Sequence, residues 1–275
     1  MRGRMPRSFA PAAAAVVVLA GFGLVGCGRG QSAPQAWTLV AAAPAKTTDA
    51  GTAKFAISAT TNLLGQSVHF TGAGVFDFAK RIGQVRVALP HELGGRDVDE
   101  IVTADTIYVQ IPGVTPDGKF AAVPLAALGG STNPLAQLGN SDPTAALETL
   151  RGASKDVRRL GGATVRGAST THYRGTIDVA TAVQAVPSRL RATVRQVFGS
   201  LKQIPFDAYI DPQGRLRRFQ QNLTLPDNGL GWGRPVTVAS TFDLYDFGTT
   251  VHIVAPQTNR IVDGSTLLRQ LTRRS

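Results

Sequence analysis

The chain has 275 residues, a formal net charge of +11 and a single cysteine. One cysteine excludes an internal disulfide, so a folded domain must be held together by an apolar core. A basic chain suits an anionic membrane surface, although the excess of arginine over lysine is equally typical of a GC-rich genome. No basic stripe is interleaved with aromatic residues, which argues against nucleic acid as a partner.

Residues 1–26 have the parts of a secretory signal peptide. Arg2, Arg4 and Arg7 give a positive start, and residues 10–24 are almost wholly apolar. This run is shorter than the roughly 20 residues that a bilayer span needs. No Arg-Arg pair precedes it, which favours the general secretory route over the twin-arginine route.

The signal segment ends at Leu24-Val25-Gly26-Cys27, which resembles the lipobox of bacterial lipoproteins. That resemblance implies that the Cys27 thiol receives a diacylglyceryl group, with acyl chains such as palmitate, and that a peptidase cuts before it. The mature protein would then be lipid-anchored at the extracytoplasmic face of the cell membrane. The alternative is a buried cysteine within an uncleaved membrane helix.

Residues 27–50 are mostly small or polar, with Pro34 and Pro44, and are predicted to be a tether behind the lipidated cysteine. The apolar residues at 37–40 leave open that part of this segment packs on the domain. Residues 51–275 are predicted to form a single domain.

The hydrophobic period becomes two from residue 54 onward, which indicates strands separated by tight turns. Strands are predicted around 55–57 and at 68–78, 85–89, 98–103 and 107–111. Residues 112–143, rich in glycine, proline and leucine, are predicted to be a long loop with short helical turns, followed by a helix at 144–151.

The second half of the chain repeats this pattern around one longer helix. Strands are predicted at 154–160, 164–167, 170–179, 204–210, 215–225, 236–247 and 250–254, and helices at 180–201 and 266–271. No βαβ alternation runs through the chain. The sequence therefore predicts an α+β fold: one strongly curved antiparallel sheet, a half-barrel of about 10–11 strands, with helices packed on its concave side.

Several segments, taken in order, resemble one family. They are Asp156–Gly162 leading into Thr170–Asp178, then Pro205–Asp211 with Leu216–Phe219, and Phe242–Gly248. Together with the lipobox they resemble the lipid-carrying lipoproteins of mycobacteria and other actinobacteria, of the LppX and LprG type. Those proteins share the half-barrel fold of the lipoprotein carrier LolA.

The resemblance implies an apolar cavity that holds acyl chains on the concave face. Ligand sites of this kind are concave and mainly apolar. The residues predicted to line it are Phe70, Gly72, Gly74, Phe76, Val85, Val87, Ile107, Val109, Phe242 and Leu244. A glycine inside a strand often marks a bend or a close approach of another group. Gly72 and Gly74 therefore fit either a sheet that curves around a ligand or a bent sheet packed on its own helices.

Enzyme signatures are missing from the sequence. It has no G-x-S-x-G elbow, no Walker loop and no H-E-x-x-H, and its four histidines lack metal-ligand spacing. Four aspartates, Asp207, Asp211, Asp243 and Asp246, lie near strand ends, where this residue type commonly makes local hydrogen bonds. Arg217-Arg218 and Arg158-Arg159 fit either lipid phosphates or solvated strand faces. No catalytic residue, metal site or cofactor is predicted.

These observations predict a membrane-anchored lipoprotein that carries a lipid or glycolipid within the cell envelope, with a membrane transporter as a further candidate partner. The main alternative is an envelope lipoprotein that serves as a scaffold or sensor for a protein partner and has a filled interior. An envelope hydrolase is a third class, for which the sequence offers no acid or nucleophile.

Overall fold

The computed structural model describes residues 35–63, 66–91, 95–124, 143–185, 198–225 and 235–264, with a few positions between 186 and 197. The chain divides into two compact units, Met1–Ala33 and Pro34–Ser275, and all described residues belong to the second. The predicted signal peptide, Cys27 and the predicted helix at 266–271 lie outside the described residues.

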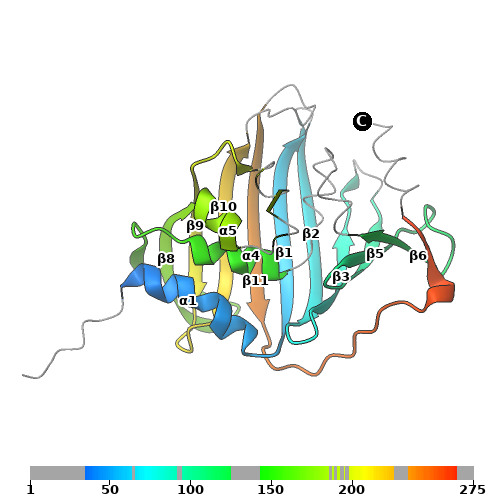
Figure 1. Ribbon diagram of the computed structural model, residues 1–275, viewed down its shortest axis with the longest axis horizontal. Helices are drawn as coiled ribbons and strands as arrows, with labels where there is room; N and C mark the ends of the chain where they lie inside the picture. Colours follow the sequence, from blue (N-terminus) through cyan, green and yellow to red (C-terminus); the bar gives the residue numbers. More distant parts are fainter. Residues whose placement is uncertain are drawn as a thin grey trace, which may run out of the picture. The chain divides into compact units, whose positions relative to one another are not determined.

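The described residues form one large sheet with few helices (Figure 1). Its twelve strands follow the order β12-β6-β5-β4-β3-β2-β1-β11-β10-β9-β8-β7. In chain order the strands are β1 Thr52–Leu63, β2 Gln66–Asp77, β3 Ile82–Ala88, β4 Asp97–Val102, β5 Thr106–Gln110, β6 Phe120–Pro124, β7 Arg158–Val165, β8 Ala168–Asp178, β9 Gln203–Ile210, β10 Leu216–Leu225, β11 Val236–Tyr245 and β12 Ile261–Asp263. The helices are α1 Ala36–Thr48, α4 Pro143–Thr149 and α5 Val179–Ala185, with the 3₁₀ turns η2 Leu150–Gly152 and η3 Thr258–Arg260.

Two antiparallel meanders make up the sheet. Strands β1–β6 form one and β7–β11 the other, and the pairing of β1 with β11 joins them. Among the described strands, only β12 and β6 pair in parallel. The predicted large antiparallel sheet is confirmed, but it is not strongly curled. The two meanders extend one open ladder, with β12 and β7 at its opposite edges.

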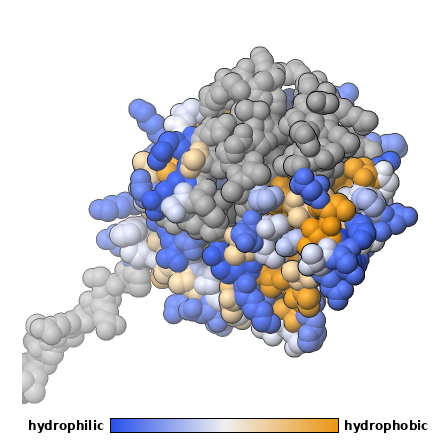
Figure 2. Space-filling model, turned by 45° about the vertical axis from the view of Figure 1, so that its right-hand side comes forward, coloured by the Kyte–Doolittle hydropathy of each residue, from blue (hydrophilic) through white to orange (hydrophobic). Residues whose placement is uncertain are grey.

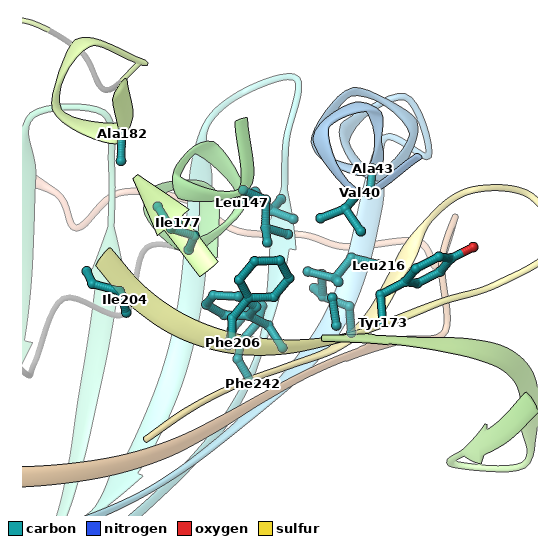
Figure 3. Packing of buried hydrophobic residues seen from close by; sticks show 14 of the residues in the cluster. Val40, Ala43, Leu147, Tyr173, Ile177, Ala182, Ile204, Phe206, Leu216 and Phe242 are labelled. Carbon is teal, nitrogen blue, oxygen red and sulfur yellow. The ribbon is translucent and has the colours of Figure 1, made fainter. Parts of the chain in front are cut away.

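Helices cover one face of the sheet, here called the helix face (Figure 1). Helix α1 contacts β7, β9 and β10, α5 contacts β8, and η2 contacts all three helices. Val40, Leu147 and Ile177 are fully buried in the resulting core, together with Phe206 and Leu216 (Figure 3). The opposite side of the sheet carries mostly polar residues and is called the polar face.

Helix α1 lies within the segment predicted to be a tether. Alanine, the best helix former, fills much of it, and Val40 and Ala43 are fully buried. Gln35 precedes the helix without a side-chain cap, and Pro44 lies inside it, so the usual start and stop signals are missing. Helix α1 therefore packs on the sheet, which is the possibility that the apolar residues at 37–40 left open.

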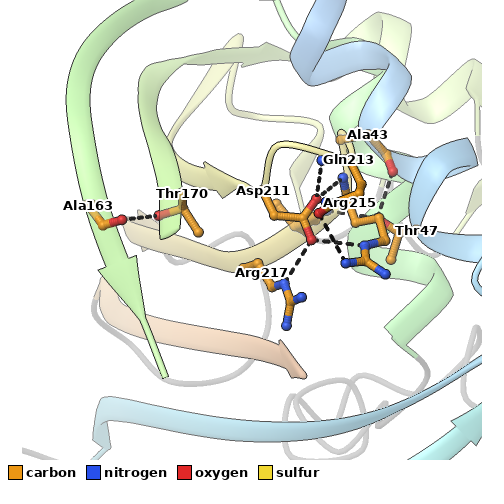
Figure 4. A network of polar contacts seen from close by, with 9 residues as sticks. Ala43, Thr47, Ala163, Thr170, Asp211, Gln213, Arg215 and Arg217 are labelled. Carbon is orange, nitrogen blue, oxygen red and sulfur yellow. Dashed lines mark hydrogen bonds and ion pairs between the residues drawn. The ribbon is translucent and has the colours of Figure 1, made fainter. Parts of the chain in front are cut away.

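The turn between β9 and β10 is tied to helix α1 by a polar network (Figure 4). The Asp211 carboxylate accepts the backbone N–H of Arg215 at 2.8 Å and the Nε–H groups of Arg215 and Arg217 at 2.9 Å each. Beside it, the Thr47 hydroxyl donates to the Ala43 carbonyl at 2.7 Å and accepts the backbone N–H of Leu216 at 2.9 Å. These bonds fix α1 to the end of the sheet.

Three predicted strands differ from the structure, and two observed strands were not predicted. Residues 250–254 form no strand, because Asp246 and Gly248 take positive φ angles of 48° and 75° and turn the chain out of the sheet. The chain then runs to the far edge, where β12 pairs with β6 (Figure 1). The predicted strands 154–160 and 164–167 are replaced by the single strand β7, with an irregularity between Arg159 and Gly161. Strand β6 lies within the predicted loop 112–143, and residues 125–142 of that loop lie outside the described part.

Candidate functional site

The ten residues predicted to line a cavity all lie on the helix face. The register aligns Gly74 with Phe55 on β1 and with Val85 on β3, and Phe55 in turn with Leu244 on β11. Since side chains alternate along a strand, the other predicted residues of β2, β3, β5 and β11 fall on the same side. The pairings that extend this face across β4 and β5 are Val85 with Glu100, and Glu100 with Val109.

These ten residues differ in burial. Phe76, Val85, Ile107, Phe242 and Leu244 are buried, and Leu244 is fully enclosed. Phe70, Gly72, Gly74, Val87 and Val109 are only half-buried. The second set lies on β2, β3 and β5, whereas the described helices contact β7–β10. Half-buried apolar positions thus extend the helix face beyond the helices. Figure 2 shows hydrophobic residues gathered where the β3–β6 side of the sheet comes forward.

The two glycines of β2 have different surroundings. A Cβ on Gly74 would lie 2.1 Å from the Gln84 carbonyl oxygen and 2.9 Å from the Val85 Cα, both backbone atoms of β3. A Cβ on Gly72 would meet nothing closer than 3.4 Å. Gly74 therefore allows the close approach of the neighbouring strand β3, a contact that decides for neither of the two explanations that the sequence left open. Gly72 has no such requirement.

One buried carboxylate interrupts the apolar helix face. Glu100 is 8% exposed and lies between Val85 on β3 and Val109 on β5. Burying a charge is costly unless it has a partner, and Glu100 has one. The alternation along β4 places the Glu100 side chain on the helix face. The sequence does not show which group it contacts there.

A groove of about 400 Å³ lies on the polar face, across β1, β11, β10, β9 and β8. Its lining is polar and apolar in about equal parts and includes the Arg174–Asp207 ion pair. The residues that line it are Ser58, Thr60, Arg174, Pro205, Phe206, Asp207, Gln220, Gln221, Asn222, Ala239, Ser240 and Thr241. The sequence did not predict this groove. The sequence signal that could have indicated it is the alternation of polar and apolar residues along these same strands.

The four aspartates that the sequence places near strand ends each form an ion pair. Asp207 contacts His172 Nε2 at 2.6 Å and Arg174 Nε at 2.9 Å, and Asp246 contacts Lys54 Nζ at 2.9 Å. Asp211 pairs with Arg215 and Arg217, and Asp243 pairs with Arg166 and Arg218. Arrangements of this kind neutralise carboxylates and hold strands together, and none places a nucleophile beside a base.

Arg217 and Arg218 are occupied by these carboxylates. Arg217 Nε donates to Asp211 at 2.9 Å, and Arg218 Nε donates to Asp243 at 2.6 Å. Burial opposes ionisation of Asp211, but hydrogen bonds from Arg215 and Arg217 outweigh it and lower the pKa of the carboxyl. Neither of the two explanations considered for the Arg217-Arg218 pair, lipid phosphates or free solvation, describes it. Arg158 and Arg159 on the edge strand β7 are exposed.

Metal-binding clusters and membrane-spanning helices are both absent from the described residues. No cluster of three or more His, Cys, Asp or Glu side chains in them could hold a metal ion. No helix among them is long and apolar enough to cross a bilayer.

Comparison with known proteins finds the kind of lipoprotein that the sequence resembles. No family model matches the chain. An uncharacterized 31.2 kDa protein of Streptomyces griseus, from the rplA-rplJ intergenic region, is 29% identical over 154 residues, which is 55% of this chain and 49% of that protein. The chain thus matches about half the length of this curated relative.

Solved structures with a similar fold include two mycobacterial lipoproteins. LppX of Mycobacterium tuberculosis matches with a TM-score of 0.47 and 17% identity, covering 79% of this chain and 99% of that one. LprF of Mycobacterium bovis matches with a TM-score of 0.45 and 16% identity, covering 82% and 98%. A LolA superfamily protein of Nitrosomonas europaea has a TM-score of 0.33 and 12% identity, covering 80% and 96%. These likenesses concern the fold alone.

Proposed function

We propose that this chain is a membrane-anchored envelope lipoprotein whose helix face binds the acyl chains of a lipid or glycolipid. One observation carries the proposal. The half-buried apolar positions Phe70, Gly72, Val87 and Val109 continue the core across β2, β3 and β5, away from the strands β7–β10 with which the described helices make most of their contacts. Apolar surface of this kind on a monomer commonly marks a site for an apolar ligand or partner.

Acyl chains fit such a surface energetically. Each buried CH₂ contributes about 0.8 kcal/mol, so a long chain gains ample binding energy without directional contacts. The ten helix-face residues predicted from the sequence would then act as one apolar lining rather than as individual recognition groups. Release of the lipid then requires a conformational change of the protein or transfer of the lipid to a partner. A membrane transporter is a candidate for that partner.

In this proposal the lipid on Cys27 tethers the protein to the membrane that supplies its cargo. We expect Cys27→Ser to prevent lipid attachment and to move the protein from the membrane fraction to the medium or the soluble envelope fraction, because a hydroxyl does not replace the thiol nucleophile. Fractionation of cells labelled with a radioactive fatty acid measures both effects. A Cys27→Ser protein that stays in the membrane fraction and keeps its label would contradict the proposed anchor.

Lipid binding is tested by two neighbouring substitutions on β2. Phe70 lies on the helix face and Thr71 is exposed on the polar face. We expect Phe70→Asp to weaken binding of the apolar fluorescent probe N-phenyl-1-naphthylamine at least about tenfold, because a charge in an apolar site is poorly solvated. Thr71→Asp should leave it unchanged. Thermal unfolding of each variant shows whether the domain remains folded.

The same experiment separates the proposed carrier from the scaffold or sensor. A carrier purified from its native host yields lipid on extraction, detected by mass spectrometry, and loses probe binding on Phe70→Asp. A scaffold with a filled interior yields no lipid, binds no probe, and responds equally to Phe70→Asp and Thr71→Asp in this assay. That second result would overturn the proposed function.

A further inference from the structure

A small polar patch interrupts the apolar helix face. It consists of Thr61 on β1, Ser240 on β11 and Gln221 on β10, and is here called the polar patch. Gln221 is paired with Ser240, and Thr61 is paired with Val238, two residues along β11. Side chains at such direct and diagonal positions on one face lie within reach of one another.

Apolar rows flank the polar patch on both sides along the strands. On one side the register places Phe219, Phe242 and Ile57 in a row; on the other, Leu223 and Val238 share the row of Thr61, and the next row places Leu225 opposite Val236. Phe242, Leu223 and Val238 are all buried. The polar patch is therefore not the polar rim of the apolar face but lies within it.

The polar patch lacks hydrogen-bond partners. Thr61 is only 2% exposed, and its hydroxyl oxygen has no partner in the described part of the chain. Ser240 and Gln221 are half-buried, and their side chains hydrogen-bond to none of the described residues. Buried polar side-chain atoms are nearly always hydrogen-bonded, so an orphaned hydroxyl calls for an explanation.

The neighbouring residues on the polar face show the contrast. Gln220 Nε2 donates to Thr241 Oγ1 at 3.1 Å, and Thr60 Oγ1 lies 3.0 Å from His69 Nδ1. These are the same residue types, one position away along β10 and β1, and they have partners although water reaches them. The lack of partners on the helix face therefore does not follow from the residue types.

We propose that the polar patch binds an oxygen atom of the lipid, an ester or hydroxyl group that has hydrocarbon on both sides. The inference rests on the proposed function and adds a chemical class of ligand to it. The Thr61 and Ser240 hydroxyls and the Gln221 amide can all donate to such an oxygen, and the hydroxyls can also accept. The apolar rows on both sides would hold the two hydrocarbon arms.

The test compares two lipids that differ only in this oxygen group. A wax ester and the n-alkane of the same carbon number are offered together, in equal amounts, in detergent micelles. The protein is then re-isolated, and its lipid is extracted and measured by gas chromatography with mass spectrometry. The substituted chain carries Thr61→Val, Ser240→Ala and Gln221→Met, which keep the side chains close to their original size. The matched control carries Thr60→Val, Thr241→Val and Gln220→Met on the polar face.

We expect the unmodified protein and the control to retain at least about five times more ester than alkane, and the substituted chain to retain the two about equally. Equal ratios in all three proteins would overturn the proposal and would assign the polar patch to trapped water. Retention of neither lipid by the unmodified protein would instead refute the proposed function. If the triple substitution prevents folding, Thr61→Val alone is measured, and an unchanged ratio there likewise counts against the polar patch.

Discussion

Replacing Gly74 by Ala is expected to lower the free energy of unfolding by about 3 kcal/mol or more, whereas the same change at Gly72 should stay within about 1 kcal/mol. The added methyl at Gly74 would lie 2.1 Å from a backbone oxygen of β3, so β3 must move away from β2. At Gly72 the nearest atoms are 3.4 Å away, and alanine loses less chain entropy on folding than glycine does.

Urea denaturation of the purified variants, followed by the fluorescence of the two tryptophans, measures both effects. Gly72→Ala is the matched control, because it lies on the same strand and the same face. Equal losses of stability at the two positions would mean that β3 does not approach β2 closely at Gly74. If the Gly72→Ala protein is stable, its binding of the fluorescent probe can also be measured, which tests whether a ligand lies at Gly72.

The side of the sheet on which each strand residue lies could be predicted from the sequence, because the strand period of two is a local property. Phe70, Gly72, Gly74 and Phe76 share the helix face, and the hairpin turn at Asp211 lies between β9 and β10, both as predicted. Helix α1 was missed because it lacks a cap and contains Pro44. Strand β12 has only three residues and exists through its pairing with β6, which no local pattern shows.

The local hydrophobic pattern could not predict contacts between strands that are distant in sequence. The pairing of β1 with β11 places the two meanders side by side, and this pairing positions Thr61 near Ser240. Likewise, Arg218 meets Asp243 because β10 and β11 pair in that register, although the sequence only marks both as polar positions. The sequence therefore predicted which strand residues share the helix face, but neither the polar patch nor the ion pairs.

Asp243 is the centre of an ion-pair network on the polar face. Arg218 donates to it through Nε at 2.6 Å and Nη2 at 2.9 Å, and Arg166, from the β7–β8 turn, donates through Nε at 2.9 Å. The Asp243 side chain is 7% exposed, whereas that of Arg166 is 42% exposed. The network ties the β7–β8 hairpin to β11, three strands away in the sheet.

Asp243→Asn is expected to lower the free energy of unfolding at pH 7 by about 2 kcal/mol, because two guanidinium groups lose their counter-charge and solvent screens only part of the loss. Asp246→Asn is the matched control. Its pair with Lys54 is about half exposed and screened by solvent, so a clearly smaller loss is expected. Similar losses in the two variants, measured by urea denaturation, would show that Asp243 contributes no more than an exposed pair.

The effect of Asp243 should also depend on pH. Burial opposes ionisation of Asp243, but hydrogen bonds from Arg218 and Arg166 outweigh it and hold the pKa of the carboxyl below its usual value. A carboxyl with a lowered pKa in the folded state stabilises the protein above its unfolded-state pKa of about 4, and this contribution disappears as the pH falls through the folded-state pKa. The difference in unfolding free energy between the unmodified protein and Asp243→Asn should therefore be constant from pH 7 to about pH 5 and shrink below about pH 4. A difference that stays constant down to pH 3 would show that the ionised carboxylate is not the source of the stability.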